Sequence, residues 1–351
     1  MEQRTVAGIV AVPLVVGLWS AALFLPAPFV TYYPGTTADL LGESDGTPIV
    51  EVEEHESFPP ESGELRMTTA SITRPETELA LVQALSAWRD PDAAVRPYSS
   101  VYDEDEDNAT SEMISTAQMT GSVDVSIAVA LAALDIDFTA NVQVGGVRVG
   151  YPAEGVLQPG DVVRSVGGRP VTAPAEVGEV VQRAGVGGRL AATIERDGED
   201  REVELVPVEE DGRAVIGITP VQGYDFPFPV RLTPPAGIGG SSAGTMFALA
   251  VYDYLTPGDL TGGLHVAGTG TISPEGEVGP IGGIAQKIPG AREDGAEVFL
   301  VPVDNCGEAL GAANGDVRLV AVDTFDRAVE TLTALADDVD ADVLTCEDVT
   351  R

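Results

Sequence analysis

The sequence contains a single lysine, Lys287, among its 351 residues. Lysine and arginine together number 19, so the remaining 19 − 1 = 18 basic residues are arginine. Arginine stays protonated in proteins, whereas a buried lysine can lose its proton near neutral pH. A lone lysine in a chain that otherwise uses arginine therefore indicates a position where a removable proton is needed.

Positive charge as a whole is scarce. The 19 basic residues stand against 56 acidic ones, which gives a net charge of −37. A surface of this kind repels nucleic acids and anionic lipids, so we expect neither as a ligand. We interpret the charge as a means of keeping the chain soluble, and an acidic binding surface is the alternative.

Cysteine and histidine occur only twice each. Cys306, Cys346, His55 and His265 show no spacing typical of metal ligands, so the sequence predicts no metal site and no cofactor. In an oxidising compartment the two cysteines could form a disulfide that holds the C-terminal tail. Two free thiols are the equally open alternative.

Charged residues are absent from a long stretch near the N-terminus. The 21 residues Thr5–Leu25 are apolar enough, and as a helix long enough, to cross a hydrocarbon core of roughly 30 Å. A signal peptide is the alternative, but its apolar core is usually about 7–15 residues and ends at a small-residue cleavage site that is not seen here. We therefore expect residues 1–30 to be an uncleaved, single-pass anchor in the cell membrane. Arg4, the only basic residue before Arg66, favours an extracytoplasmic location for the bulk of the chain.

The next part of the chain, residues 31–139, has a mixed α/β pattern and no recognisable function. Its apolar patterns predict two strands, an amphipathic helix, and a second helical stretch that is broken near a glycine. These are Ile49–Val52, Leu65–Thr69, Glu76–Trp88, and Met113–Leu134 with its break near Gly121.

Residues 140–210 read as a small strand-rich domain. A Pro-Gly-Asp turn at 159–161 precedes the strand Val162–Val166, and Asp197-Gly198 joins two alternating segments as a hairpin. The stretch YPAEGVLQPGDVVRSVGGRPV resembles the core of PDZ domains. This resemblance implies a module that binds extended peptide ends by adding a strand to a sheet edge. A generic small β domain is the alternative.

A glycine-rich turn further along delivers two serines to the start of a helix. Gly237-Ile238-Gly239-Gly240 leads into Ser241-Ser242-Ala243-Gly244 and then the apolar helix Thr245–Leu255. Glycine lets the backbone approach a substrate closely, and the free amides of a helix N-terminus can bind an oxyanion. By itself the pattern is also that of an ordinary loop with an N-cap serine.

The lone lysine follows 45 residues after Ser242, in the segment GPIGGIAQKIPGA. A neutral lysine amine can take the proton of a serine hydroxyl and so activate it as a nucleophile. Burial among Ile281, Ile284 and Ile288 would lower the pKa of the lysine toward neutrality. A surface lysine is the alternative.

Three segments together resemble the proteolytic domain of Lon-type peptidases: GGSSAGTMFALA, LTGGLHVAGTGTISPEGEVGPIGGIAQKI and GAEVFLVPVDNC. With the apolar N-terminal segment and the PDZ-like stretch, the chain is similar to the membrane-bound, PDZ-containing Lon-like proteases of bacteria. The resemblance implies Ser242 as nucleophile in preference to Ser241, Lys287 as base, Thr269 as a support for the lysine, and a homo-oligomeric, hexameric ring. It also implies an α+β multidomain chain with a Lon-type α/β domain at 215–335 and an acidic tail at 336–351.

Three features depart from the pattern of that family. Gly239 stands where many Lon enzymes have an aspartate, and Pro289 lies two residues after the lysine, where it would strain a continuous helix. The sequence also contains no G-x4-G-K-[ST] loop, so no ATPase is expected.

The sequence thus predicts an ATP-independent, membrane-anchored serine endopeptidase that cleaves polypeptides with a Ser242–Lys287 dyad. Backbone amides near residues 239–243 are expected to hold the oxyanion. The alternative is a membrane-tethered PDZ scaffold that binds peptides and carries an inactive Lon-like domain.

Overall fold

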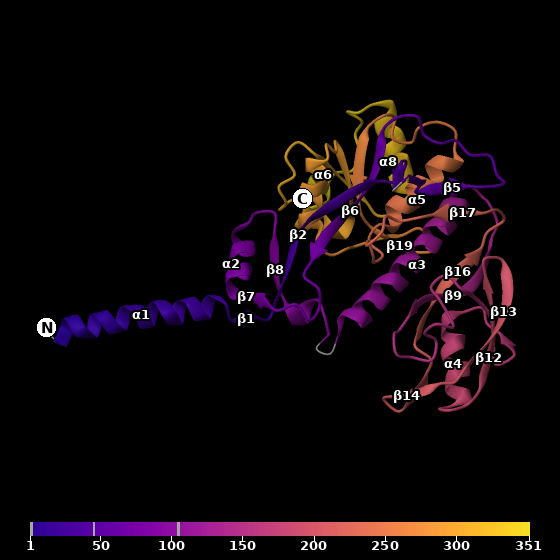
Figure 1. Ribbon diagram of the computed structural model, residues 1–351. Helices are drawn as coiled ribbons and strands as arrows, with labels where there is room; N and C mark the ends of the chain where they lie inside the picture. Colours follow the sequence, from indigo (N-terminus) through magenta and orange to yellow (C-terminus); the bar gives the residue numbers. More distant parts are fainter. Residues whose placement is uncertain (1–2, 45, 104–105) are drawn as a thin grey trace.

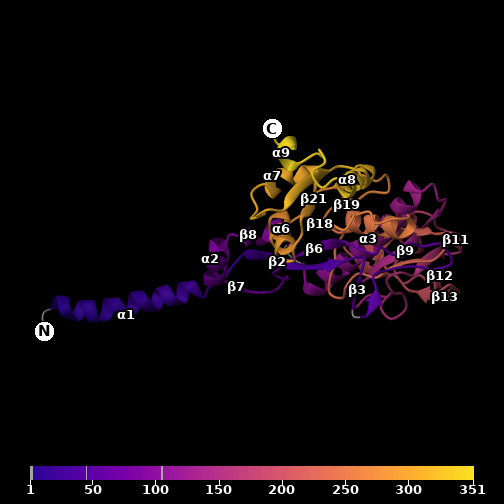
Figure 2. The same ribbon diagram turned by 90° about the horizontal axis from the view of Figure 1, so that it is seen from above.

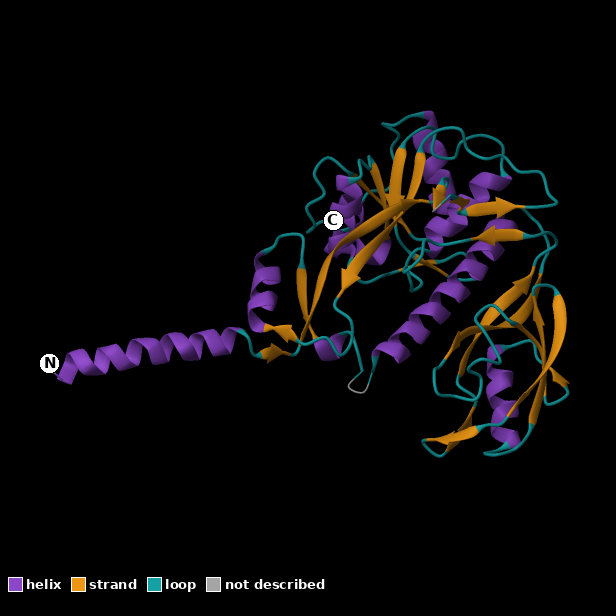
Figure 3. Ribbon diagram, viewed as in Figure 1, coloured by secondary structure: helices purple, strands orange, loops and turns teal. Residues whose placement is uncertain are grey.

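The computed structural model describes residues 3–44, 46–103 and 106–351. Figure 1 shows a long N-terminal helix that points away from a body made of two β-rich parts. The larger part holds a six-stranded mixed sheet with helices on its faces, and the smaller part holds an antiparallel sheet with one helix (Figure 3).

The N-terminal helix α1 spans Gln3–Leu23, close to the predicted Thr5–Leu25, although the first two residues of the predicted 1–30 segment lie outside the described residues. Figures 1 and 2 both show it projecting from the body. Val16, Leu18 and Trp19 on it are 58–68% exposed. Among the helices in the described part of the chain, none is both long and apolar enough to cross a lipid bilayer. The predicted membrane-spanning helix is therefore not supported.

The large sheet has the strand order β22-β21-β18-β6-β2-β8. Its C-terminal half is parallel, and β2 pairs antiparallel with both β6 and β8. The strands are β2 (Phe29–Asp39), β6 (Glu64–Ile72), β8 (Ala94–Pro97), β18 (His265–Gly268), β21 (Val298–Pro302) and β22 (Arg318–Val322). Half of these strands come from the region predicted as a separate α/β part, so residues 31–139 are built into the same fold as the C-terminal domain.

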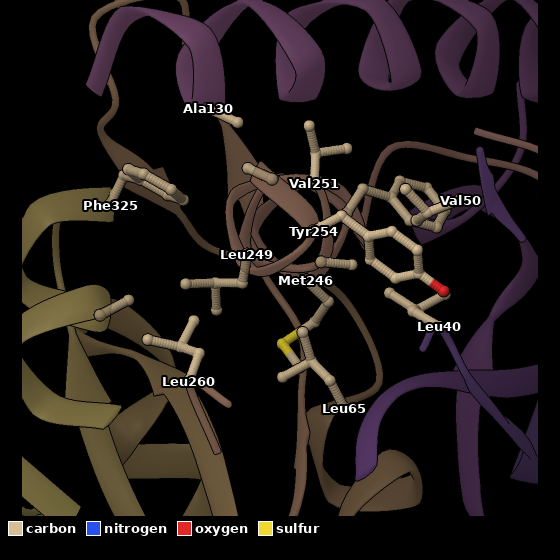
Figure 4. Packing of buried hydrophobic residues seen from close by; sticks show 14 of the residues in the cluster. Leu40, Val50, Leu65, Ala130, Met246, Leu249, Val251, Tyr254, Leu260 and Phe325 are labelled. Atoms are coloured by element: carbon tan, nitrogen blue, oxygen red, sulfur yellow. The ribbon is translucent and has the colours of Figure 1, made fainter. Parts of the chain in front are cut away.

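Helix α5 (Gly244–Leu255), predicted as Thr245–Leu255, forms the centre of the main core. Figure 4 shows Met246, Leu249, Val251 and Tyr254 radiating from it toward the surrounding elements. Nearly all of its residues are buried, as the largely apolar composition of the helix requires. The turn in front of α5 is therefore held on a rigid base.

Two helices of the N-terminal region differ from their predictions. Helix α2 spans only Leu81–Arg89, because Glu76 has a positive φ of 59° and begins a turn in place of the predicted helix start. Helix α3 runs unbroken over Asn108–Ala133. Gly121 does not interrupt it, and at this point the helix packs on Val221 of the smaller sheet.

The smaller sheet has the order β13-β12-β10-β9-β16 and is antiparallel throughout. The predicted hairpin is present, with positive φ at both Asp197 and Gly198, as a tight type I′ turn requires. The domain extends beyond the predicted 140–210, because β16 pairs with β9 along its whole length. Its elements are β9 (Thr139–Val147), β10 (Val162–Val166), β11 (Arg169–Pro170), α4 (Pro174–Ala184), β12 (Leu190–Arg196), β13 (Glu199–Leu205), β14 (Val208–Glu210), β15 (Arg213–Val215) and β16 (Ile218–Asp225).

The C-terminal segment packs on the large sheet. Cys306 and Cys346 form a disulfide, which resolves the open question of their state and joins α7 (Cys306–Ala309) to α9 (Cys346–Val349). The remaining elements are β1 (Pro26–Ala27), β3 (Glu43–Ser44), β4 (Thr47–Pro48), β5 (Val50–Val52), β7 (Leu79–Ala80), β17 (Val230–Leu232), β19 (Thr271–Ile272), β20 (Val278–Gly279), α6 (Ile284–Glu293), α8 (Phe325–Asp337) and the 3-10 turns at Tyr98–Ser100 and Val303–Asn305.

Candidate active site

The turn Gly239–Gly244, called the nucleophile turn below, places Ser242 just before α5. Gly240 has a φ of +85°, a conformation that glycine adopts without strain. Ala243 is the N-cap residue of the helix, so Ser242 lies one residue outside the first helical turn. Ser242 is half-buried, with its side chain at a cleft.

Lys287 comes from α6, which packs on β2 and β6. Gly283 precedes this helix with a φ of +74° and turns the chain into it. The helix continues through Pro289 to Glu293, so the strain expected at the proline does not end it. The Lys287 side chain is directed into the protein and is 3% exposed.

The two predicted residues meet although they are 45 positions apart in the sequence. Lys287 Nζ lies 2.7 Å from Ser242 Oγ, within hydrogen-bond distance. Thr269 follows β18 and is fully buried, and its Oγ1 accepts a hydrogen bond from Lys287 Nζ at 2.8 Å. The same Thr269 hydroxyl donates to the carbonyl oxygen of Ser242 at 2.8 Å. The structure thus brings together all three residues that the sequence singled out.

Burial lowers the pKa of Lys287 from 10.5 to about 7. An ammonium group removed from water loses its hydration, which disfavours the charged form. Ile284 and Ile288, both fully buried on the same helix, contribute to this apolar setting. At neutral pH a large fraction of the side chain is therefore a free amine that can accept a proton.

The backbone around Ser242 supplies hydrogen-bond donors. The amide of Gly240 donates to the Ser115 carbonyl at 3.0 Å, which removes it from the set of amides predicted to hold an oxyanion. In the described part of the chain, no acceptor lies within hydrogen-bond distance of the Ser242 and Ala243 amides. These two amides at the start of α5 are thus free to bind negative charge that develops beside Ser242.

A cleft of about 810 Å³ contains both Ser242 and Lys287. One wall is β6 from Met67 to Ile72, and others are α3 and the nucleophile turn. The cleft has no acidic residue among its described lining residues, although the chain contains 56. Elsewhere in the described residues, no group of three or more His, Cys, Asp or Glu side chains is arranged to hold a metal ion.

Residues 232–332 match the model of the Lon protease (S16) C-terminal proteolytic domain. This match supports a serine-type peptidase. The Lon-type region, as residues 232–332 are called below, contains Ser242, Thr269 and Lys287. The chain is also 33% identical over 109 residues to Lon protease 2 of Bacillus subtilis, covering 30% of this chain and 19% of that protein. It is 34% identical over 98 residues to the archaeal Lon protease of Archaeoglobus fulgidus, covering 27% of this chain and 15% of that protein. The chain thus spans less than a fifth of the length of these curated relatives.

Part of the chain is also similar to solved PDZ domains. The PDZ domain of an SdrC-like protein from Listeria monocytogenes is 23% identical, with a TM-score of 0.22, over 23% of this chain and 87% of that one. The PDZ domain of an SdrC-like protein from Listeria innocua is 22% identical, with a TM-score of 0.21, over 22% of this chain and 90% of that one.

The Lon-type region alone does not complete the site. The cleft is also lined by β6 and by α3, which lies before the smaller sheet in the sequence. Sequence reasoning gave these elements no role, because an ordinary strand and helix carry no chemical signature. The one available signal for a role of α3 was the recurrence of serine along Asn108–Ala133.

Proposed function

We propose that the protein is an endopeptidase in which Ser242 is the nucleophile and Lys287 the general base. The observation that carries this proposal is the 2.7 Å contact between Lys287 Nζ and Ser242 Oγ, on a lysine that is 3% exposed. A nucleophile and its base within hydrogen-bond reach, with a third group orienting the base, is the arrangement that such catalysis needs. Thr269 is the orienting group.

The reaction follows from these positions. Neutral Lys287 accepts the proton of the Ser242 hydroxyl while Oγ attacks the carbonyl carbon of a peptide bond. The resulting oxyanion is held by the Ser242 and Ala243 amides. The lysine then gives its proton to the leaving amine, and an acyl-enzyme remains. Water attacks the ester with Lys287 again as base, which releases the carboxylic acid and restores the serine.

Substrate is proposed to bind as an extended strand along β6. Strand β18 pairs with β6 only over Glu64–Met67, whereas β6 continues to Ile72 along the wall of the cleft. This leaves one edge of its last residues open toward Ser242. An open strand edge binds an extended peptide through main-chain hydrogen bonds with little dependence on sequence, which suits a peptidase that acts on unfolded polypeptides.

The smaller sheet is proposed to bind peptide ends as PDZ domains do. A cavity of about 310 Å³ lies between α4 and the edge formed by Ile216, Gly217 and Ile218. Val177 and Val181 make its helical wall apolar. This surface would retain an unstructured segment of a substrate near the cleft.

The location and assembly of the chain are further proposals. Exposed apolar side chains between Val12 and Trp19 of α1 favour attachment to a membrane, and the Cys306–Cys346 disulfide favours an oxidising, extracytoplasmic compartment. ATP-independent action rests on the missing phosphate-binding loop, and ring assembly on the resemblance to Lon-like proteases. Flotation with vesicles, a C-terminal topology reporter and sedimentation analysis test these points separately.

The peptidase reaction is tested by three variants of the full chain in detergent. Ser242→Ala and Lys287→Arg should each lower cleavage of an unfolded protein at least 10³-fold, roughly the scale seen when such groups are removed. Ser241→Ala, at the neighbouring half-buried serine, is the matched control and should stay active. A serine-directed acylating reagent should label Ser242 only. Equal cleavage by all four proteins would refute the proposal and favour the peptide-binding scaffold.

A further inference from the structure

Helix α3 lies against the nucleophile turn. The helix belongs to neither of the two recognisable segments of the chain. Its Ser122 and Ser126 are 7% and 0% exposed, and both hydroxyls face carbonyl groups of the turn. Buried hydroxyls are costly unless they are hydrogen-bonded, and the carbonyl groups of the turn are among the partners that satisfy these two.

Each serine contacts a carbonyl group within two residues of the nucleophile. Ser126 Oγ lies 2.8 Å from the carbonyl oxygen of Gly244, two residues after Ser242. It also lies 2.6 Å from the carbonyl oxygen of Ser122 on its own helix, so its one hydrogen is shared between these acceptors. Ser122 Oγ donates to the carbonyl of Ser241, directly before the nucleophile, at a longer 3.4 Å.

The backbone of α3 adds a third contact. The Ser115 carbonyl accepts the Gly240 amide at 3.0 Å, and Ser115 also leaves no room for a side chain at Gly239. A Cβ atom there would lie 2.0 Å from Ser115 Oγ. The first half of the nucleophile turn thus rests directly on the helix.

The turn is held by contacts from α3 and by contacts from the segment that follows β18. Thr269 Oγ1 and the Gly270 amide hold the Ser242 carbonyl from the β18 side, each at 2.8 Å. The α3 serines bond the carbonyls of Ser241 and Gly244. With its carbonyls bonded in this way, the turn is fixed in place, while the Ser242 and Ala243 amides keep no hydrogen-bond acceptor among the described residues, as oxyanion binding requires.

We propose that Ser122 and Ser126 of α3 are positioning residues for Ser242. They fix the orientation of its hydroxyl and of the Ser242 and Ala243 amides. This inference rests on the proposed peptidase function. It assigns to residues outside the Lon-type region a part in the reaction, through the Ser241 and Gly244 carbonyls and without contact to the substrate.

The test compares Ser126→Ala and Ser122→Ala with wild type in the full chain. We expect Ser126→Ala to lower kcat and the rate of Ser242 acylation by about tenfold, with KM changed less than twofold, because the group acts on the geometry of attack and not on substrate binding. Ser122→Ala should have the smaller effect, since its contact is longer. Ser126→Thr, which keeps the hydroxyl, should recover part of the loss.

Thr120→Ala is the matched control. It removes a hydroxyl from the same helix that bonds the carbonyl four residues earlier and points toward the smaller sheet. Its acylation rate should equal that of wild type, and all variants should be compared at matched thermal stability. If Ser126→Ala and Ser122→Ala are both acylated at the wild-type rate, the inference about α3 is overturned and the proposed function is not. A wild-type chain that is not labelled at Ser242 would overturn the proposed function and the inference together.

Discussion

At the scale of single residues, the chemistry depends on where Lys287 is buried. Its ammonium form has two oxygen partners, the Ser242 and Thr269 hydroxyls, and no carboxylate among its hydrogen-bond partners. The dominant effect on its pKa is therefore loss of hydration, which an opposite charge would have offset. In a chain with 56 acidic residues, the absence of acid from the described lining of the cleft keeps this lysine deprotonable.

The first prediction concerns the titration of this lysine. The pKa is lowered from 10.5 to about 7, so the reactive amine accumulates as pH rises through about 7. We expect the acylation rate of Ser242 to rise with pH and to level off above about 8, where an ordinary lysine would still be protonated. Because the chain has a single lysine, protein labelled with isotopic lysine gives one side-chain resonance, and its titration measures the pKa directly.

The matched sample is the Ser242→Ala variant, which keeps the buried lysine. Its resonance should also titrate far below 10.5, since burial and not the serine lowers the pKa. A resonance that titrates near 10 in wild type would contradict this prediction.

The candidate residues could be predicted because each lies in a segment with a chemical signature. The residues that pack around them could not be predicted. Gly239 was read as a departure that put activity in doubt, yet the structure gives a steric reason for it, since Ser115 occupies the space that a side chain would need. Ser115 lies over 100 positions earlier in the sequence, and no local pattern relates the two residues.

At the scale of elements, the periodic segments were predictable and their limits were not. The helix after Ser242 and the hairpin at Asp197-Gly198 follow from local pattern and turn chemistry. The start of α2 and the continuity of α3 depend on tertiary contacts, which override the local preference of residues such as Gly121. The joining of β2 and β6 to the C-terminal strands is likewise a long-range pairing that one sequence does not display.

The second prediction concerns the disulfide at the C-terminal end. Cys306 and Cys346 close a loop with a sequence separation of 40. Removing this constraint, in a Cys306→Ala/Cys346→Ala variant, should lower the free energy of unfolding by about 2–4 kcal/mol. Denaturant unfolding monitors this loss, and a reducing agent should lower the stability of wild type but not of the variant. Equal stability of both proteins under oxidising conditions would contradict the prediction.

Acylation of Ser242 should change little in the same variant. Helix α7 packs on α6, but neither α7 nor α9 contributes a residue to the described lining of the cleft. This separates a loss of stability from a loss of catalytic geometry.

At the scale of the whole molecule, α3 is shared by the two β-rich parts. One side holds the nucleophile turn, and the other packs on β9 and β16 of the smaller sheet. Asp124 lies in this second contact, where Gln143 donates a side-chain hydrogen bond to it. Burial raises the pKa of Asp124 to about 7, partly offset by hydrogen bonds from Gln143 and the Tyr224 backbone.

The third prediction follows from the sign of that shift. A carboxyl group with a raised pKa binds its proton more tightly in the folded state than in the unfolded state. Its stabilisation is therefore fully present below about pH 4 and is lost as pH rises through about 7. After correction for the intrinsic rate, hydrogen exchange at β9 and β16 should accelerate as pH rises from about 4 to about 7 and change little above that. The Asp124→Asn variant should lose this pH dependence, whereas Asp135→Asn, at the other end of the helix region, should keep it.

The first and last strands of the smaller sheet along the chain, β9 and β16, are neighbours in the sheet. Thr139 at the start of β9 pairs directly with Asp225 at the end of β16, so the chain leaves this domain beside the point where it entered. The rings of Phe138, Tyr224 and Phe226 pack against one another at this junction. Paired residues in adjacent antiparallel strands lie about 5 Å apart, a gap that a short turn can bridge. The smaller sheet is thus an insertion with a two-stranded neck, exchangeable for another domain without rerouting the strands around Ser242.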